Sequence, residues 1–406
     1  MCAIAGYLGL GSPGNLEAMA AAMAHRGPDG EGFFSDPSAA IGLAHRRLSI
    51  IDPTAAAAQP MVSCGGRYRV VFNGEIYNFR EIARELIAAG YEFNVNSDTA
   101  VLGPLYDRYE TQAFGRLNGI FAIAIWDANR RELVVARDGF GVKPLYYAKA
   151  RGLFAFASEL KALLTFPSIA GKLDVAALLD YLVNLWSPGC STPFQNIHKL
   201  LPGHFIRARL DAFEIVRWYA PPLGRSELSR RNDIGSIGQN LRDAFDRAVT
   251  RQCLSDVPIG AFLSGGVDSS AVVASMVKSA NPPKRTYCIA FDGPSMLDEG
   301  FGDDFAHARM LADRLSVPLT KIAVQEPGAE ELASLPFMLD EPQADPAALY
   351  VAAIAKAARR DGIKVLLAGT GGDDILSGYR RHRLAALRDR LAAWRILIPA
   401  GVLRAS

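Results

Sequence analysis

Residues 257–270, V-P-I-G-A-F-L-S-G-G-V-D-S-S, are the stretch that best predicts a fold for this chain. Residues 257–263 have the β-branched and aromatic content of a buried strand, and residues 269–277 continue at helical spacing. Residues 264–268 are therefore expected to form a turn from a strand into a helix. Such turns bind phosphate, because glycine lets a ligand approach the backbone and the N–H groups of a helix start attract an anion.

The chemistry of this turn differs from that of the usual triphosphate loop. That loop needs a Lys followed by Ser or Thr after its second Gly, whereas this turn carries Asp268. A carboxylate fits an anion-binding loop if it holds Mg²⁺ on the phosphates. The run S-G-G-V-D-S-S resembles the pyrophosphate loop of the N-type ATP pyrophosphatases. This resemblance implies that ATP is cut between its α- and β-phosphates and that a substrate is activated as an acyl-adenylate.

The segments around the turn predict an α/β domain with a parallel sheet. A helix begins near residue 237, and strands are expected at 286–291, 319–324 and 363–368, with helices at 304–315 and 347–359. Alternating strands and helices favour a parallel sheet with helices on both faces and a ligand at the carboxyl ends of the strands. The loop G-T-G-G-D-D at 369–374 should then face the turn, so that Asp268 and Asp373 share Mg²⁺ on the pyrophosphate.

Composition favours a small-molecule partner. The chain has 406 residues, a formal net charge of +2 and 21% charged residues, which indicates neither a nucleic-acid groove nor a membrane surface. Its five cysteines are scattered and lack metal-ligand spacing, so we expect no disulfide framework or zinc site and a reducing cytoplasm. The N-terminus does not read as a secretory signal. The apolar patch at 394–403 is shorter than the roughly 20 residues of a spanning helix, and we expect a core or interfacial helix there.

Cys2 is the candidate nucleophile of the first half. If the initiator Met is removed, a thiol and a free α-amino group share one residue. An amine with a pKa of about 7.7 to 8 is a plausible base for that thiol. A buried structural cysteine at the start of a strand is the alternative that Cys2 alone leaves open.

An ordered series of motifs follows Cys2. The motifs are H-R-G-P-D-G at 25–30, H-R-R-L-S-I-I-D at 45–52, Q-P-M at 59–61, N-G-E-I-Y-N at 73–78, S-D-T at 97–99, G-I-F-A-I-A-I-W-D at 119–127, A-R-D at 136–138, K-P-L-Y-Y at 143–147 and A-S-E-L-K at 157–161. Together they resemble the class II glutamine amidotransferase domain of the glutamine-hydrolysing asparagine synthetases.

The resemblance implies roles for particular residues. Cys2 would attack the side-chain amide of glutamine, with the Asn73 side chain and the Gly74 N–H as oxyanion hole. Arg47 would pair with the substrate carboxylate and Asp98 with its ammonium. The implied glutamine pocket is completed by the backbone around Leu48, Ser49, Ile50, Ile51 and Glu75.

The resemblance also implies roles in the second half. The phosphates would be held by Ser264, Gly265, Gly266, Asp268, Ser269 and Ser270, and the adenosine by Leu263, Ile289, Ala368 and Gly369. Residues 340–342 (D-E-P) and 345–346 would lie beside the acceptor.

The fold class expected from these relatives has two parts. The first is an α+β four-layer sandwich of the N-terminal-nucleophile type, and the second is the α/β parallel-sheet ATP pyrophosphatase domain. Strands are expected at 43–50, 69–72, 121–126, 133–136 and 154–157, and helices at 79–89, 99–109 and 173–185. A polar break rich in Pro, Gly and charge suggests residues 1–210 as the first domain, 211–235 as a linker and 236–406 as a second domain that is C-terminally short for the family.

The combined motifs predict an ATP-dependent ligase that releases ammonia from glutamine and transfers it to an adenylated carboxylate, with ATP and Mg²⁺ as cofactors. Aspartate, giving asparagine with release of AMP and pyrophosphate, is the default acceptor, and the family leaves a homodimer open. Thr370 departs from the Glu or Asp of relatives, and a hydroxyl cannot take up a proton at neutral pH as a carboxylate does. This keeps open amidation of another carboxylate, such as a sugar uronate or a peptide-like acceptor. A glutaminase or assembly partner without synthetase activity is the third reading.

Overall fold

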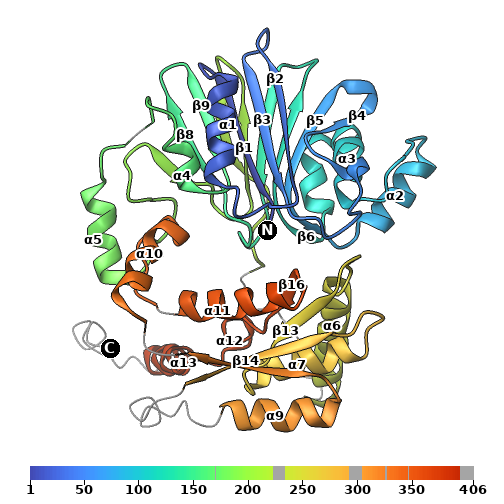
Figure 1. Ribbon diagram of the computed structural model, residues 1–406, viewed down its shortest axis with the longest axis vertical. Helices are drawn as coiled ribbons and strands as arrows, with labels where there is room; N and C mark the ends of the chain where they lie inside the picture. The colour runs from blue at the N-terminus through green and yellow to red at the C-terminus, as the bar shows by residue number, and fades with distance from the viewer. Residues whose placement is uncertain (170, 223–233, 292–303, 325–326, 346, 394–406) are drawn as a thin grey trace. The chain divides into compact units, whose positions relative to one another are not determined.

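The computed structural model describes residues 1–169, 171–222, 234–291, 304–324, 327–345 and 347–393. The chain divides into two compact units (Figure 1). The first unit comprises Met1–Phe245, Leu254–Val257 and Glu326–Ala352, and the second comprises Asp246–Cys253, Pro258–Gln325 and Ala353–Ser406.

Two six-stranded antiparallel sheets form the centre of the first unit. One sheet has the order β10-β8-β9-β1-β3-β2 and contains β1 (Ala3–Gly9), β2 (Gly30–Asp36), β3 (Ile41–Arg47), β8 (Tyr146–Ala150), β9 (Leu153–Ala157) and β10 (Ile197–Lys199). The other has the order β12-β11-β7-β6-β5-β4 and contains β4 (Met61–Ser63), β5 (Tyr68–Ile76), β6 (Gly119–Asp127), β7 (Glu132–Arg137), β11 (His204–Ala208) and β12 (Phe213–Arg217).

Alternation along the strands produces the layers. In β1, Ile4 and Leu8 belong to the core between the two sheets, while Ala5 and Tyr7 belong to the core beneath the outer helices. Successive strand residues point to opposite faces, so a strand that is apolar on both faces is covered on both. Each sheet therefore needs a second covering layer on its outer face.

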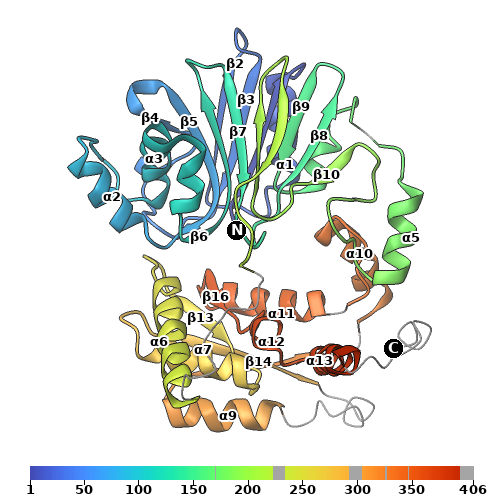
Figure 2. The same ribbon diagram turned by 180° about the vertical axis from the view of Figure 1, so that it is seen from behind.

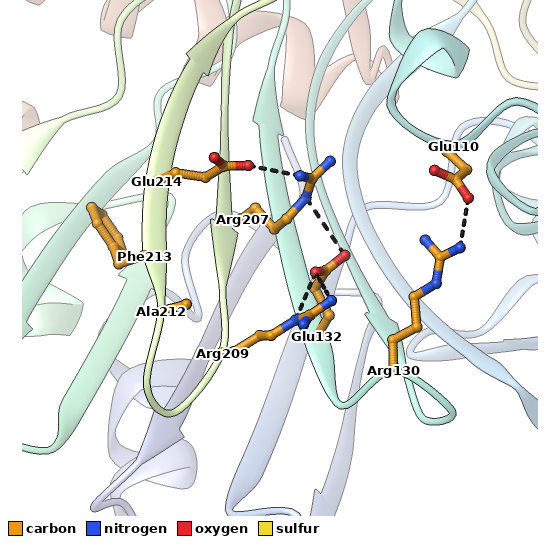
Figure 3. Close-up of a pocket in the computed structure, with 8 residues that line it drawn as sticks. All are labelled: Glu110, Arg130, Glu132, Arg207, Arg209, Ala212, Phe213 and Glu214. Atoms are coloured by element: carbon orange, nitrogen blue, oxygen red, sulfur yellow. Dashed lines mark hydrogen bonds and ion pairs between the residues drawn. The ribbon is translucent and has the colours of Figure 1, made fainter.

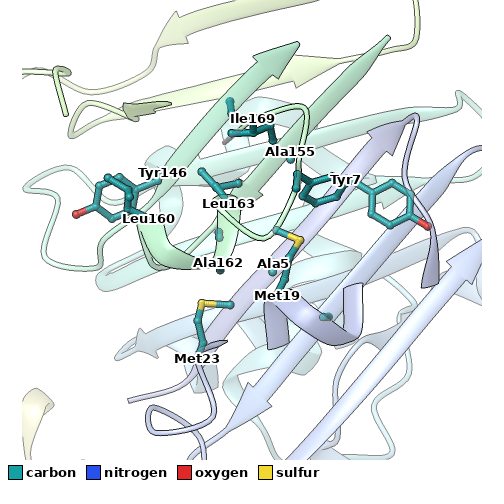
Figure 4. Packing of buried hydrophobic residues seen from close by; sticks show 14 of the residues in the cluster. Ala5, Tyr7, Met19, Met23, Tyr146, Ala155, Leu160, Ala162, Leu163 and Ile169 are labelled. Carbon is teal, nitrogen blue, oxygen red and sulfur yellow. The ribbon is translucent and has the colours of Figure 1, made fainter. Parts of the chain in front are cut away.

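Helices supply those outer layers, as Figure 2 shows from behind. The first sheet is covered by α1 (Pro13–Ala22) and α4 (Leu160–Leu163), and Figure 4 shows Met19 and Leu163 packed next to Ala5. The second sheet is covered by α2 (Phe79–Ala88) and α3 (Leu102–Tyr109). Short 3-10 helices lie at η1 (Ala55–Ala57), η2 (Cys64–Gly66), η3 (Asp98–Val101) and η4 (Glu110–Arg116). The expected four-layer sandwich is confirmed.

The second unit contains a four-stranded parallel sheet with the order β15-β14-β13-β16. Its strands are β13 (Ile259–Phe262), β14 (Arg285–Phe291), β15 (Leu319–Val324) and β16 (Val365–Leu367). Helices that the structure describes in this half of the chain include α6 (Ile234–Gln252), α7 (Val267–Val277), α9 (Asp304–Leu315), α11 (Ala347–Arg360), α12 (Gly372–Leu376) and α13 (Arg380–Ala393). Ile354 of α11 packs in one cluster with Tyr287 of β14. The expected parallel sheet is confirmed.

Two differences from the sequence-based expectation affect the candidate sites. The strand expected at 43–50 ends at Arg47, because the backbone of Leu48 turns toward the sulfur of Cys2. The segment Glu326–Ala352, with α10 (Ala329–Leu339), groups with the first unit together with α5 (Val175–Asn184). It does so because Asp340 and Glu341 pair with Lys161 and Lys199 of that unit.

The apolar patch at 394–403 lies outside the described residues. Within the described ranges, no helix is both long enough and apolar enough to cross a membrane.

Candidate functional site

The antiparallel pairing of β1 with β3 creates the candidate glutaminase pocket. Ala3 pairs with Arg46, so Cys2 lies opposite Arg47 at the end of the two strands. The Leu48 N–H donates to Cys2 Sγ at 3.3 Å, and the Leu48 carbonyl oxygen lies 3.5 Å from the same sulfur. The thiol is thus fixed by the backbone that follows β3.

The structure brings most of the predicted glutamine-site residues to one cavity. Its lining includes the predicted residues Cys2, Arg47, Leu48, Ile50, Ile51, Gly74, Glu75 and Asp98. It also includes five residues that were given no site role, namely Ala57, Gln59, Phe72, Ser97 and Thr99. Gln59, Ser97 and Thr99 stood in the Q-P-M and S-D-T motifs, which was the available signal. Two predicted residues, Ser49 and Asn73, are not among the lining side chains.

Asn73 lies on β5 with only 1% of its surface exposed, and its Nδ2 has no hydrogen-bond partner among the described residues. A buried donor without an acceptor is costly, which favours a position kept for a ligand oxygen. Its neighbour Gly74 has no room for a side chain, because a Cβ there would lie 2.1 Å from the Ile120 carbonyl oxygen. The backbone at Gly74 is therefore held close against β6.

Asp98 lies at the start of η3, where its Oδ2 accepts from the Ile76 N–H at 3.1 Å. Burial raises the pKa of Asp98 to about 6, although this backbone bond favours the ionised form. Burial and the nearby Asp98 also raise the pKa of Glu75 well above its usual range. The pocket thus contains two carboxyl groups that resist ionising together, and a bound ammonium would relieve that repulsion.

Arg47 is held at the other side of the cavity. Its guanidinium donates to the Thr54 carbonyl oxygen at 2.7 Å and to that of Asp52. Its charge is thus oriented by neutral carbonyl groups and is available to an anionic ligand.

The pKa of the candidate nucleophile, Cys2, depends on its surroundings. Burial raises the pKa of the Cys2 thiol, while the Leu48 N–H and the nearby amino terminus oppose that shift. Burial lowers the pKa of the Met1 α-amino group to about 6, and this group donates to the Arg26 carbonyl oxygen at 3.1 Å. This amino group belongs to Met1, so its lowered pKa describes the chain before Met1 is removed and not the α-amino group of Cys2.

The glycine-rich turn is the second candidate site. Ser264 N donates to Ser269 Oγ at 3.2 Å, and Ser269 Oγ donates to the Gly266 carbonyl oxygen, also at 3.2 Å. Gly265 has φ +81°, a conformation that glycine adopts without strain. The turn closes directly onto α7, whose first helical residue is Val267. The predicted strand, turn and helix around residues 264–268 are all present.

The loop after β16 lies against this turn, because β16 pairs with β13. A Cβ on Gly369 would lie 2.6 Å from Ser269 N, and one on Gly372 would lie 2.2 Å from Asp268 Oδ2. The glycines of residues 369–372 therefore permit a close approach of two backbone segments that are a hundred residues apart in sequence.

The other predicted ATP residues occupy the same edge of the sheet. Leu263 follows β13 and is fully buried, Ile289 lies on β14 beside the α11 cluster, and Ala368 follows β16. Ser270 lies in the first turn of α7, where its N–H donates to the Gly266 carbonyl oxygen. All these residues come from the carboxyl ends of neighbouring parallel strands or from the loops after them.

The two predicted metal ligands fit Mg²⁺ in their donor chemistry. Asp268 is half-buried and Asp373 is exposed. Mg²⁺ binds through one or two carboxylates and otherwise keeps water and phosphate oxygens. Within the described ranges, no group of three or more His, Cys, Asp or Glu side chains has the arrangement of a protein-only metal site.

A further hollow lies between β7, β11 and β12, and its polar groups are already paired (Figure 3). Glu132 lies between Arg207 and Arg209, with a distance of 2.8 Å to the latter. Arg130 pairs with Glu110 at 2.6 Å, and Arg207 also pairs with Glu214 at 2.7 Å. Because each guanidinium has a carboxylate partner, we assign this hollow no ligand.

Comparisons with known proteins cover both halves of the chain. Residues 1–219 match the family model described as "Glutamine amidotransferase domain", and residues 240–404 match that described as "Asparagine synthase". "Asparagine synthetase [glutamine-hydrolyzing] 1" of Bacillus subtilis is 36% identical over 88% of this chain and 55% of its own length. "Amidase chry2" of Gibberella zeae is 30% identical over 93% of this chain and 57% of its own. The chain thus spans about half the length of these relatives.

One solved structure also aligns along most of the chain. It is the B. subtilis glutamine phosphoribosylpyrophosphate amidotransferase with ADP and GMP, at 13% identity, a TM-score of 0.42 and 91% coverage of each chain. We draw no argument from an overlap of that size.

Proposed function

The chain belongs to the family of glutamine-hydrolysing asparagine synthetases, and on this premise we propose that it is an ATP-dependent amidotransferase. It would release ammonia from glutamine at Cys2 and transfer it to an adenylated carboxylate. The observation that most supports this is the cavity in which Cys2 lies with Arg47, Asp98 and Gly74, next to the unpartnered donor of Asn73.

In the glutaminase reaction, the Cys2 sulfur attacks the side-chain amide carbon of glutamine. The Asn73 Nδ2 and the Gly74 N–H stabilise the oxyanion, and one such donor typically contributes on the order of 10²–10³ in rate. Arg47 pairs with the substrate carboxylate and Asp98 with its ammonium. Once Met1 is removed, the α-amino group of Cys2 is the base that takes the thiol proton and delivers it to the departing ammonia. Water then hydrolyses the γ-glutamyl thioester left on Cys2, which releases glutamate and restores the thiol.

In the synthetase reaction, residues 264–270 hold the phosphates of ATP at the start of α7. Leu263, Ile289, Ala368 and Gly369 line the nucleoside pocket. The acceptor carboxylate attacks the α-phosphate, pyrophosphate leaves, and ammonia then displaces AMP from the acyl-adenylate. Asp268 and Asp373 would hold Mg²⁺, which supplies positive charge beside the departing pyrophosphate.

We propose aspartate as the acceptor and asparagine as the product, following the family. Domain boundaries at 210 and 235, a homodimer and a cytoplasmic location are further parts of this proposal, although the first part of the proposed linker, Phe213–Arg217, forms β12 of the second sheet. All five cysteines are free, which suits a reducing compartment.

The test measures two activities of the full chain separately. We expect glutamate release from glutamine, and ATP–pyrophosphate exchange that requires both Mg²⁺ and aspartate. Glutamate release without any exchange would reduce the protein to a glutaminase. If aspartate does not stimulate ATP–pyrophosphate exchange but another carboxylic acid does, aspartate is not the acceptor.

A further inference from the structure

Four charged side chains form a continuous series inside the first unit and end at the backbone of the nucleophile. Asp340 Oδ1 lies 2.7 Å from Lys161 Nζ, and Lys161 Nζ lies 2.7 Å from Glu159 Oε2. Glu159 Oε1 accepts from Arg26 NH1 at 3.0 Å. Arg26 Nε in turn donates to the Cys2 carbonyl oxygen at 3.0 Å. We call these four residues the Asp340 relay.

The relay is shielded from solvent. The exposed fractions of the four side chains are 5% for Asp340, 12% for Lys161, 8% for Glu159 and 9% for Arg26. Ion pairs in this setting are screened little by water or salt, and removing one partner leaves the others uncompensated. A change at Asp340 should therefore reach Glu159 and Arg26, unlike a change in an exposed pair.

Backbone contacts tie the same residues to the start of β1. Asp340 Oδ2 accepts from the Leu160 N–H at 2.7 Å, next to Lys161. Ser158 Oγ accepts from the Ile4 N–H at 3.0 Å, and Ser158 N donates to the Ile4 carbonyl oxygen at 2.9 Å. The short segment 158–161 therefore contacts both Asp340 and the strand that begins just after Cys2.

Asp340 belongs by sequence to one family range and by its contacts to the unit that contains Cys2. Asp340 falls within residues 240–404, which match the asparagine synthase model, yet its contacts place it in the first unit. It has φ +64°, a left-handed conformation that non-glycine residues adopt at a cost. The turn is thus held in place by its bonds to Leu160 and Lys161.

We propose that Asp340 is a positioning residue for Cys2, so that the synthetase segment 326–352 sets the rate of glutamine hydrolysis through Lys161, Glu159 and Arg26. The inference rests on the proposed function and adds a regulation of the same site. In the part of the chain that the structure describes, the relay contacts the Cys2 backbone and makes no hydrogen bond or ion pair with Arg47 or Asp98, the residues assigned to glutamine binding. Its loss should therefore lower kcat and leave KM for glutamine nearly unchanged.

The experiment compares three variants of the full chain. D340N removes the negative charge and keeps the size of the side chain. D340E keeps the negative charge on a side chain that is one methylene longer. E132Q is the matched control, because Glu132 is an equally buried carboxylate of the same unit whose ion pairs are with Arg207 and Arg209, outside the relay. Each variant is assayed for kcat and KM of glutamate release, for thermal unfolding, and for alkylation of Cys2 by iodoacetamide, followed by mass spectrometry of the N-terminal peptide.

We expect D340N to lower kcat roughly tenfold and to change the alkylation rate of Cys2, because small misplacements of reacting groups cost that much or more. D340E should recover most of the rate, and E132Q should match the wild type. If D340N unfolds at the assay temperature, K161M breaks the same relay and the same outcomes apply.

The inference is overturned if D340N and E132Q behave alike, or if the D340N effect appears only in KM. Failure of the proposed function is a separate result, since the unsubstituted chain would then release no glutamate. The alkylation measurement needs no turnover and distinguishes the two.

Discussion

The two candidate sites are built in opposite ways. The Cys2 cavity is assembled from separate segments around residues 2, 47–51, 57–59, 72–75 and 97–99, which antiparallel pairing brings to one place. The glycine-rich turn is one continuous stretch, 264–270, joined by a single second loop at 369–373. The first is shielded by the sandwich, whereas Ser264, Gly266 and Val267 of the second are exposed.

This difference indicates which kind of substitution should impair each site. A cavity made from many strands depends on individual buried groups, because each is held by a different part of the sheet. A loop at a strand end depends on its backbone conformation, because that is what presents the N–H groups. Substitutions should therefore separate the two activities cleanly.

The largest effect is expected from C2A. Loss of the proposed nucleophile should lower glutamine hydrolysis by at least about 10⁴-fold, as removal of a covalent catalyst does elsewhere. Ammonia-dependent amide formation by the same variant should persist, because the second site is built from other segments. Retained glutamate release would remove Cys2 from the mechanism.

The next effect is expected from N73A, which removes the buried donor without altering Cys2. We predict a loss of about 10²–10³ in kcat for glutamate release with little change in KM. Steady-state kinetics on glutamine measures it, and ATP–pyrophosphate exchange serves as the internal control. A purely raised KM would place Asn73 in binding and not in the oxyanion hole.

A backbone substitution, G265A, tests the other site. A Cβ at Gly265 would lie 2.6 Å from the Asp304 carbonyl oxygen, and the φ of +81° disfavours alanine. We expect pyrophosphate exchange to fall roughly 10²-fold, because the turn and α9 must shift, while glutamate release is kept. G362A is the matched control, since Gly362 has φ +75° but nothing within 4 Å of an added Cβ. Equal losses in both variants would assign the effect to strain alone.

The smallest effect concerns pH. The pKa of Asp98 is raised to about 6, so its carboxylate is lost as pH falls through that value. Because we propose the ionised form as the partner of the glutamine ammonium, KM for glutamine should rise about tenfold between pH 7 and pH 5. D98N should have a high KM that stays flat over this range. A pH-independent KM in the unsubstituted chain would contradict the assigned role.

Much of the fold could be predicted where local pattern suffices. Strand alternation at Ile123 and Ala124 and the helix after Asp268 are properties of short segments, and the structure contains both. The end of β3 at Arg47 could not be predicted, since nothing in the sequence shows that Leu48 leaves the ladder to contact Cys2. The roles of Gln59 and Thr99 were missed for the same reason. Gln59 Nε2 donates to Thr99 Oγ1 at 3.1 Å across forty residues.

The sequence by itself determined the family, the two fold classes and the identity of the residues proposed for chemistry, because motif spacing and hydrophobic period are local quantities. The tertiary structure decided which of those residues share a cavity, that the Asn73 donor lacks a partner, and that Asp340 joins the first unit. These are consequences of strand pairing and buried charge, which depend on contacts between distant segments and leave no mark in any single stretch of the chain.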